Sequence, residues 1–508
     1  KVQGSPGTGK SFVINTNRNI TATIMRRNNT AISIAPTGCA ASLIGGATLN
    51  RMCSIPVGKK FIGPVTALPT NNAVKLKDFV KTWCDAFAVF QDEDSMVGRP
   101  FWGWIKFRIE EARRMSSQFS PPELATFSHN VTSLCNRPFG GIPVMYSFGD
   151  VQQLPPVMMK AMHDVTLPNK PSSSCAQGIV AVKEFLTPSN PIHNISLSVV
   201  MMDVVWQQDP AFLNLLKHMT DGNINQEDIE LINSRRLCNL SADDKLLFND
   251  ALHIMPQWEM TKKITFEYLK QLNQPIAIIR PRYNTSLSSG KNHCIKECNV
   301  PKSTAIAVGC RVMLLRNFVV EQNLMNGAIG TVVQIVYETI EGPNDKNVHL
   351  PLPIYVIVEF PTSTIPDANK MCAQLTSKHV AISPITSRCE KNSCSCTTIP
   401  LRVCKAITIH KSQGITVGEG HAWPSVVLTL PDERSKNKNT GAELVGFSRA
   451  TDIERLAIVD AHPNSSNSLE YWYRLGNSPA AKLKNEFIAK LQAMSQITVP
   501  LMKACIAN

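Results

Sequence analysis

The segment Gly4-Ser5-Pro6-Gly7-Thr8-Gly9-Lys10-Ser11 decides the fold class of this chain. It satisfies the phosphate-loop pattern, in which glycines let the backbone curl so that successive N–H groups face one anion. Lys10 would place a point charge on the β and γ phosphates of ATP, and the Ser11 hydroxyl would ligate Mg²⁺. Residues 12–20 would form the helix whose N-terminus completes the nest. The segment predicts an α/β nucleotide-binding unit, and a Gly/Pro loop without a ligand is the alternative.

Two adjacent carboxylates, Asp92 and Glu93, follow the apolar run at residues 86–90, which predicts a buried strand. Asp92 would hold Mg²⁺ through water, and Glu93 would activate the attacking water. An Asp-Glu pair by itself is usually a solvated turn. Because this pair follows a strand and lies downstream of a phosphate loop, the catalytic interpretation is favoured.

The composition describes a globular protein with a basic surface. The chain has 508 residues, about three to four times the usual domain size, which predicts more than one folding unit. It is 43% hydrophobic and 18% charged, which excludes a disordered or fibrous polymer, and it contains no apolar run long enough to span a membrane. Basic residues outnumber acidic ones, 52 to 39, and residues 1–77 contain ten basic residues and no acidic one. This imbalance predicts a polyanionic partner.

The cysteines indicate reduced thiols and an intracellular address, because there are 15 of them, an odd number, at irregular spacing. Cys389, Cys394, Cys396 and Cys404 also suggest zinc. Their spacing lacks the paired C-x-x-C of a zinc ribbon, so thiols are favoured over a metal site.

The start of the sequence predicts that most of the first strand is missing. A phosphate loop is positioned by a buried parallel strand of about five residues. Only residues 1–3 precede this loop, the first residue is Lys, and no signal-peptide pattern follows. We therefore expect the natural protein to begin upstream.

A second segment, Gly149-Asp150-Val151-Gln152-Gln153-Leu154-Pro155-Pro156-Val157, follows the strand-like run at residues 142–148. It resembles motif III of the PIF (petite integration frequency) DNA helicases, in the B group of helicase superfamily one. The other matches, which follow the family's order, are Ala35 to Ala41 (motif Ia), Asp92 to Met96 (motif II), Thr408 to Gly414 (motif V) and Ser448 to Thr451 (motif VI). The likeness covers about residues 4 to 460.

The resemblance implies roles for individual residues. Gln153 would sense the γ-phosphate, and Arg449 would act as an arginine finger. A loop glutamine and a surface salt-bridge arginine are the alternatives. Gly414 would contact the nucleotide, and the DNA backbone would be gripped by Pro36, Thr37, Gly38, Thr408, His410, Lys411, Ser412 and Gln413, which do not read bases.

The resemblance also implies an architecture of two RecA-like P-loop NTPase lobes with ATP between them. The first lobe would span residues 1–205, with a small wedge insertion at about 46–76. The second would span residues 206–309 and 402–470, and a small β-barrel at 310–401 would be inserted in it, because short β-branched runs occur there. In the tail at 471–508, residues 480–494 alone have helical character.

Three positions depart from the family pattern. Trp206 stands where motif IV carries a second arginine finger, Gln91 replaces an apolar residue, and Asn50 replaces a DNA-contacting histidine. The family's upstream adenine-binding glutamine is also absent from the chain. These departures predict a partial copy, of the kind that Helitron-like mobile elements carry.

The resemblance implies an ATP-dependent DNA helicase that moves 5′ to 3′ and uses ATP and Mg²⁺. Single-stranded DNA and single/double-strand junctions would be its partners, and it would act as a monomer in the nucleus or the mitochondrion. DNA repair, recombination and telomere maintenance are the implied processes. The alternative is a catalytically weak or inactive remnant that only binds DNA.

Overall fold

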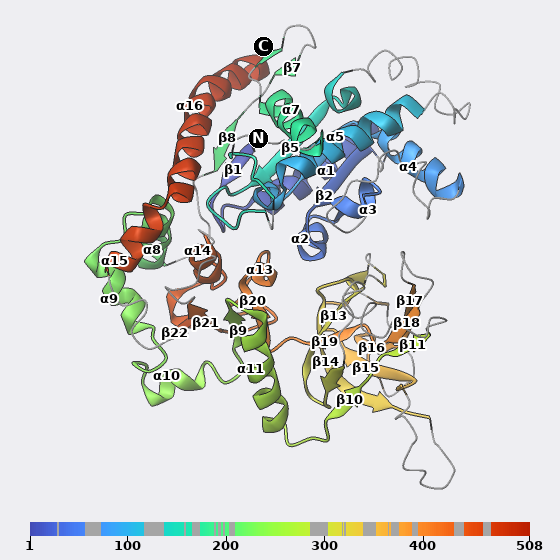
Figure 1. Cartoon of the computed structure of the whole chain (residues 1–508), viewed down its shortest axis with the longest axis vertical. Coiled ribbons are helices and arrows are strands. Elements are labelled where there is room, and N and C mark those ends of the chain that lie inside the picture. Colours follow the sequence, from blue (N-terminus) through green and yellow to red (C-terminus); the bar gives the residue numbers. More distant parts are fainter. Residues whose placement is uncertain are drawn as a thin grey trace. The chain divides into compact units, whose positions relative to one another are not determined.

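The computed structural model forms two compact units (Figure 1). The first contains residues 1–241, 412–416 and 430–508, and the second contains residues 242–411 and 417–429. The structure describes residues 1–27, 30–55, 73–115, 137–156, 159–164, 173–186, 189–190, 195–196, 199–202, 209–284, 303–316, 318–319, 322–338, 352–363, 365–366, 375–388, 395–430, 441–460 and 469–507.

The first unit is built on a six-stranded sheet in the order β3-β2-β4-β5-β1-β8, and every neighbouring pair is parallel. The strands are β1 (Val2–Gly4), β2 (Ala31–Ala35), β3 (Ala47–Thr48), β4 (Ala88–Gln91), β5 (Val144–Gly149) and β8 (Val200–Met202). Both faces of this sheet are covered. In β4, Ala88 and Phe90 enter one core while Val89 enters another, as the period of two requires.

The helices of the first unit include those that connect the strands of this sheet and pack on it (Figure 1). They are α1 (Lys10–Met25), α2 (Gly38–Leu43), α3 (Leu49–Met52), α4 (Ala73–Asp85), α5 (Arg99–Arg114), α7 (Ser173–Leu186), α8 (Pro210–Asp221), α9 (Gln226–Ser234), α14 (Ala442–Phe447), α15 (Leu469–Gly476) and α16 (Pro479–Ala507). Short 3₁₀ turns are η3 (Asp94–Met96), η6 (Pro138–Gly141) and η9 (Ile453–Arg455), and the remaining strands are β6 (Ser189–Asn190), β7 (Ile195–Ser196) and β22 (Leu456–Asp460). Local signals fix several ends: Asp209 caps α8, and a capping box formed by Asn225 and Asp228 begins α9.

The second unit combines a small parallel sheet with antiparallel strands. β9 (Leu252–Met255) pairs in parallel with β20 (Ala406–Thr408) and with β21 (Val426–Leu430). An antiparallel sheet has the order β16-β15-β14-β13-β19, and a three-stranded one has the order β11-β18-β17. The other elements are α10 (Ala242–Leu246), α11 (Trp258–Gln271), β10 (Ala277–Ile279), β11 (Arg282–Asn284), β12 (Thr304–Ile306), β13 (Arg311–Leu314), β14 (Ile329–Val336), β15 (Tyr355–Glu359), β16 (His379–Ile382), β17 (Ile385–Arg388), β18 (Ser395–Thr398), β19 (Leu401–Val403) and α13 (Ile409–Ser412).

The α/β class with a parallel sheet is confirmed, and so are the elements expected around the motifs. The helix after the phosphate loop is longer than expected, and the strands before the motif II and motif III residues end at Gln91 and Gly149. The C-terminal helix also exceeds its expected length, because α16 continues to Ala507. The lobe boundaries stay a prediction, but Arg449, expected in the second lobe, lies in the unit that contains the phosphate loop.

Several expected features lie outside the described residues. These are Trp206, Cys389, Cys394 and residues 56–72 of the wedge insertion. Among the described helices, none is both long and apolar enough to cross a membrane.

A substitution at Trp83 would test how much the larger core of the first unit contributes to stability. The Trp83 side chain is fully buried in α4, and its indole N–H donates to the Met52 carbonyl at 3.0 Å. Trp83→Ala leaves a cavity and removes this hydrogen bond, so we expect it to lower the free energy of unfolding by about 3 to 5 kcal/mol in urea titrations. Lys81→Ala, at an exposed position in the same helix, is the control and should stay within about 0.5 kcal/mol of wild type. Equal effects of the two changes would mean that α4 is not part of the core.

Candidate functional site

The phosphate loop forms the compact nest that its sequence predicts. β1 pairs with β5 on one side and β8 on the other, and all three of its residues are buried. Gly7 and Gly9 have φ of 78° and 81°, and the Thr8 hydroxyl donates to the Ser5 carbonyl at 2.8 Å. Lys10 Nζ donates to the carbonyls of Gly4 at 2.8 Å and Ser5 at 3.0 Å. The ammonium therefore lies against the curled backbone, as a phosphate-binding lysine requires.

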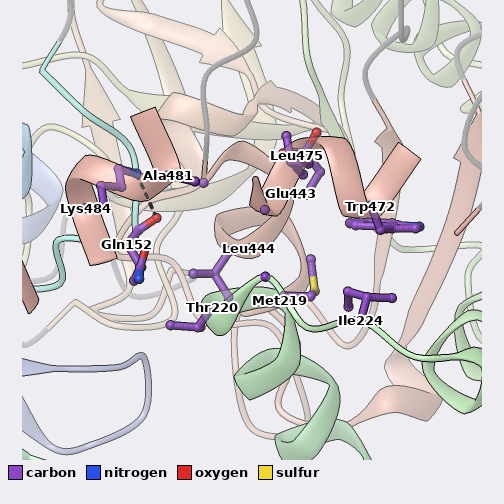
Figure 2. Close-up of a pocket in the computed structure, with 13 residues that line it drawn as sticks. Gln152, Met219, Thr220, Ile224, Glu443, Leu444, Trp472, Leu475, Ala481 and Lys484 are labelled. Carbon is purple, nitrogen blue, oxygen red and sulfur yellow. Dashed lines mark hydrogen bonds between the residues drawn. The ribbon is translucent and has the colours of Figure 1, made fainter. Parts of the chain in front are cut away.

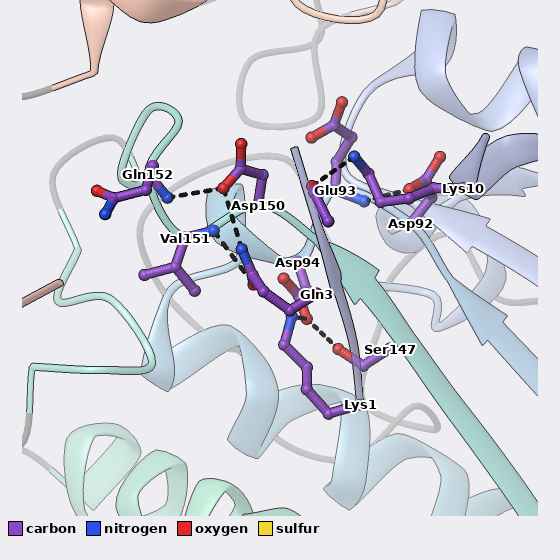
Figure 3. A network of polar contacts seen from close by, with 11 residues as sticks. Lys1, Gln3, Lys10, Asp92, Glu93, Asp94, Ser147, Asp150, Val151 and Gln152 are labelled. Carbon is purple, nitrogen blue, oxygen red and sulfur yellow. Dashed lines mark hydrogen bonds and ion pairs between the residues drawn. The ribbon is translucent and has the colours of Figure 1, made fainter. Parts of the chain in front are cut away.

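The two carboxylates lie at the carboxyl end of β4 (Figure 3). Asp92 is buried, accepts a hydrogen bond from the Glu93 N–H at 2.9 Å, and has a pKa raised to about 7 by burial and by the adjacent Glu93 charge. Burial also raises the pKa of Glu93, although Lys10, Arg449 and a hydrogen bond from Gln413 act against this rise. Glu93 has a left-handed backbone with φ of 52°, a conformation that non-glycine residues adopt at a cost.

The donor set at this position fits Mg²⁺. Asp92 supplies carboxylate oxygens and Ser11 a hydroxyl at the start of α1, and Mg²⁺ prefers oxygen ligands. Burial and the Glu93 charge raise the pKa of Asp92 even though the Lys10 charge acts against this rise. A bound cation would oppose that rise and keep Asp92 ionised.

One buried amide links the catalytic carboxylate to the predicted sensor. Gln413 Nε2 donates to Glu93 Oε2 at 2.9 Å and to Gln153 Oε1 at 3.0 Å. Gln153 is itself buried and donates from its main-chain N–H to the Asp150 carbonyl at 3.1 Å. Gln413 was predicted to touch DNA, and this role stays a prediction. Its side chain is buried at the nucleotide site instead of exposed on the surface.

Arg449 is buried, and its position is set by a group of main-chain acceptors. Nε donates to the Val445 carbonyl at 2.8 Å and Nη1 to the Ile415 carbonyl at 3.1 Å. Nη2 donates to the Ser448 hydroxyl at 2.8 Å. Its charge favours the ionised form of Glu93, so the guanidinium is close enough to influence the site electrostatically.

A second polar network lies next to the phosphate loop and the two carboxylates (Figure 3). Asp94 pairs with Lys1 Nζ and accepts from the Ser147 hydroxyl, and all three side chains are buried. Gln3 Nε2 donates to Asp150 Oδ1 at 3.0 Å. These contacts join β1, β5 and the residues after β4, so the phosphate loop and the carboxylates are held in one frame.

A cavity of about 630 Å³ opens beside the phosphate loop in the first unit. The loop contributes Gly4, Ser5 and Pro6, and the motif III segment contributes Asp150 and Gln152. Most of the other lining residues come from β8, α8 and α16. Its walls mix apolar side chains, such as Met202 and Leu213, with polar ones. The volume is ample for a nucleoside.

The predicted DNA residues of motif V lie in the second unit as far as Lys411. Thr408 and His410 are half-buried, Lys411 is exposed, and burial lowers the pKa of both His410 and Lys411. The nearby Arg402 charge also lowers the pKa of Lys411. Neither Arg402 nor Lys411 has an acidic partner among the described residues, so these two cations are suited to bind a polyanion.

Sequence reasoning missed two residues at this basic cluster. The Arg402 guanidinium lies over the Trp258 ring, 4.8 Å from its centroid, and the Trp258 side chain is 42% exposed. A large exposed aromatic beside cations is typical of single-strand binding surfaces. Trp258 at the start of a helix was the available signal, but its pairing with Arg402 depends on the tertiary structure.

The remaining predicted residues lie in the first unit. Pro36, Thr37 and Gly38 are half-buried after β2, and the Thr37 hydroxyl caps α2 by accepting from Ala40 N–H at 3.2 Å. Ser412 is fully buried, and Gly414, with φ of 81°, lies near α2. Their nucleotide and DNA roles stay predictions.

Two of the four cysteines considered for zinc lie in the described residues, and the choice between thiols and a metal site stays a prediction. Cys396 and Cys404 are buried and unbonded, and burial raises the pKa of both. No group of three or more metal-binding side chains occurs within the described ranges.

Comparison with known proteins supports the motifs. Residues 1–230 match a family model described as PIF1-like helicase. The ATP-dependent DNA helicase PIF1 of Candida albicans is 26% identical over 339 residues, which are 66% of this chain and 32% of that protein. The chain therefore spans about a third of the length of this curated relative.

Two solved structures share the fold. The crystal structure of the Candida albicans Pif1 helicase has a TM-score of 0.62 at 21% identity, covering 97% of this chain and 94% of that one. A Bacteroides Pif1 helicase in complex with ADP-AlF3 and ssDNA has a TM-score of 0.57 at 20% identity, covering 90% and 87%.

The raised pKa of Asp92 predicts how stability depends on pH. The folded state keeps the proton up to a pKa of about 7, whereas the unfolded chain releases it near its usual pKa of about 4. The free energy of unfolding should therefore fall as pH rises from about 4 to about 7, because the folded state binds more protons there. Asp92→Asn removes this penalty and should exceed wild type in stability by about 1 to 4 kcal/mol at pH 8, with a smaller difference at pH 4.

Urea unfolding of wild type and Asp92→Asn at several pH values measures this difference. Asp78→Asn, at an exposed position in α4, is the control and should follow the wild-type pH dependence. Parallel curves for Asp92→Asn and wild type would show that the Asp92 carboxylate is not penalised by folding.

Proposed function

We propose that the chain, whose residues 1–230 match the PIF1-like helicase model, is an ATP-dependent DNA helicase that couples ATP hydrolysis to movement along single-stranded DNA. One observation carries the proposal. Gln413 of motif V bridges Glu93 and Gln153, which connects the hydrolytic residues to the segment that is expected to hold DNA. A protein that only binds nucleotide would not require this connection.

Each side chain of the site has a role in ATP hydrolysis. Lys10 exchanges its loop carbonyls for the β and γ phosphates, and Glu93 accepts a proton from the attacking water. Arg449 neutralises charge that develops on the transferred phosphoryl group. Asp92 and Ser11 would hold Mg²⁺, which when bound would supply charge neutralisation for the phosphates.

Gln413 and Gln153 would report the presence of the γ-phosphate. The Gln153 amide can hydrogen bond to this phosphate or to the attacking water. Losing the phosphate after hydrolysis would free Gln153 and change its contact with Gln413, which lies two residues from Lys411 along the chain. A hydrolysis event would thereby alter the grip of motif V on DNA. The nucleoside of ATP would lie in the cavity beside the phosphate loop.

DNA would be bound through its phosphates by Pro36, Thr37 and Gly38 of motif Ia and by Thr408, His410 and Lys411 of motif V. We add Arg402 as a further phosphate contact and Trp258 as a stacking platform for a base. Single-stranded DNA and single/double-strand junctions are the proposed substrates, and movement is 5′ to 3′. A Bacteroides Pif1 helicase of the same fold forms a complex with ssDNA, which supports this substrate class.

The finer features of the proposal follow the family resemblance. The two lobes are RecA-like, the antiparallel strands of the second unit belong to a β-barrel-like insertion, and the chain acts as a monomer in the nucleus or mitochondrion. DNA repair, recombination and telomere maintenance are the proposed processes. Trp206 in place of an arginine favours a second candidate, a catalytically weak remnant that binds DNA.

Two variants separate binding of ATP from its hydrolysis. Lys10→Ala removes the phosphate contact, so both ATP affinity and turnover should be lost. Glu93→Gln removes the base, so turnover should fall by about 10²-fold or more while ATP affinity stays within about threefold. DNA-stimulated phosphate release and titration with a fluorescent ATP analogue measure the two quantities. Equal loss of affinity in both variants would make Glu93 structural, and DNA binding without hydrolysis by wild type would favour the remnant.

The Trp258–Arg402 pair predicts two separable effects on single-stranded DNA. Trp258→Ala should weaken binding by about 5- to 100-fold, the usual range for one stacked base, whereas Trp258→Phe should retain most of the affinity. Arg402→Ala should reduce the slope of log affinity against log salt by about 0.7, the value for one phosphate contact. Phe266→Ala, an exposed aromatic in the same helix with Lys270 over its ring, is the control. Anisotropy titrations that showed unchanged affinity in Trp258→Ala would remove Trp258 from the DNA site.

A further inference from the structure

The C-terminal helix α16 contributes a buried lysine to the motif III loop. Lys484 is 2% exposed, and its Nζ donates to the main-chain carbonyl of Gln153 at 2.7 Å. It also donates to the main-chain carbonyl of Gln152 at 3.1 Å (Figure 2). None of the motifs matched in this sequence includes α16, and the match to the family model covers residues 1–230. Lys484 is thus joined to the predicted sensor, although more than 300 residues separate them along the chain.

Burying an ammonium is costly unless its hydrogen bonds and charge are compensated. Two carbonyls accept from Lys484, and the charges of Asp150 and Glu443 favour its ionised form. Burial still lowers the pKa of Lys484 to about 8. A neutral apolar residue would avoid the cost of burying a charge, but it would leave the Gln152 and Gln153 carbonyls without this donor. The lysine is therefore explained by its two hydrogen bonds and not by packing alone.

The loop is fixed from a second side by α14, the helix that leads to Arg449. Gly441, the residue before α14, has φ of 101°, and a Cβ there would lie 2.4 Å from the Gln152 carbonyl oxygen and 2.8 Å from that of Gln153. Two further contacts involve Gln152. Its Nε2 donates to Asn485 Oδ1 at 2.6 Å, and its main-chain N–H donates to Asp150 Oδ1 at 3.0 Å. The two carbonyls are therefore held between α14 and α16.

We propose that Lys484 is a positioning residue for motif III: by holding the Gln152 and Gln153 carbonyls it keeps the Gln153 amide against Gln413, and α16 thereby sets the rate of DNA-stimulated ATP hydrolysis. The inference rests on the proposed function. Gln153 contacts Gln413 through its side chain, and the direction of that side chain follows from its backbone. Because misplacement of a catalytic group by about 1 Å can cost about 10²-fold in rate, a small shift of the loop is enough to uncouple the sensor.

The surroundings of Lys484 allow an informative pair of substitutions. Lys484→Met keeps an unbranched side chain one heavy atom shorter but removes its donors and charge. Lys484→Arg keeps both, and a cavity of about 40 Å³ beside Lys484, lined also by Gln152, Thr220 and Leu444, gives the guanidinium room (Figure 2). Lys482→Met, at an exposed position in the same helix, is the matched control.

The first measurement is DNA-stimulated ATP hydrolysis by the full chain. Lys484→Met should lower kcat by about 10- to 100-fold, while KM for ATP stays within about threefold because the phosphate loop is not touched. Lys484→Arg should restore most of kcat, and Lys482→Met should match wild type. If Lys484 merely supported the fold, Lys484→Met would instead lower the melting temperature, and Lys484→Arg would not recover kcat.

The second measurement follows the same variants with pH. As pH rises from 7 to 9, Lys484 loses its proton, and wild-type kcat should fall relative to that of Lys484→Arg, which stays charged. The charged and titratable groups around it are Asp150, Glu443, Tyr471, which donates to Glu443 at 2.7 Å, and His163, whose pKa is lowered to about 4 by burial and by Lys484. They are present in both proteins, so the ratio of the two rates isolates Lys484.

The third measurement needs no activity. Hydrogen exchange of the peptide at residues 149–154 should accelerate in Lys484→Met and stay unchanged in Lys482→Met and Lys484→Arg. If wild type hydrolyses no ATP, the proposed function fails, and the exchange result alone decides whether Lys484 positions the loop. The inference would be overturned if Lys484→Met kept both the kcat and the hydrogen-exchange rate of wild type. A loss of kcat that matches a loss of melting temperature and is not rescued by Arg would also overturn it.

Discussion

The direction of the strands in the first unit is the constraint on which the site depends. In a parallel sheet, all carboxyl ends meet at one edge, so the residues that follow β1, β2, β4 and β5 are brought together. The phosphate loop, motif Ia, the Asp92–Glu93 pair and motif III are those residues. Several charges are therefore gathered in a small, partly dry volume, where each changes the protonation of the next.

Gln413 is suited to a site where several charges lie close together, because its amide is neutral and has two N–H groups. One N–H donates to the Glu93 carboxylate and the other to the Gln153 amide oxygen, a combination that no carboxylate could supply. A lysine would supply donors, but its charge would stabilise ionised Glu93 and weaken it as a base. The hydrogen bond lowers the pKa of Glu93 without adding a charge. A neutral linker can therefore report on the site without overriding its electrostatics.

Buried ionic contacts outside the reacting groups give the site its precision. The Lys1–Asp94–Ser147 cluster ties the strand before the phosphate loop to the residues after β4. Lys484 similarly ties α16 to the motif III loop. Such contacts add little net stability, since desolvation offsets much of their attraction, but they admit few alternative geometries. Their place next to the catalytic residues is consistent with a requirement for geometry more than for stability.

The sequence by itself determined the α/β class, the phosphate loop, the paired carboxylates and the order of the motifs. These features depend on residue type and on spacing over a few positions, which a chain of letters records directly. Only the tertiary structure decided that Gln413 lies against Glu93, that Arg402 covers Trp258, and that Lys484 is buried under motif III. Whether a polar side chain is solvated or buried depends on which remote elements pack over it. The sequence shows α16 as a helix with several lysines, and only packing against the loop after β5 distinguishes Lys484 from its exposed neighbours.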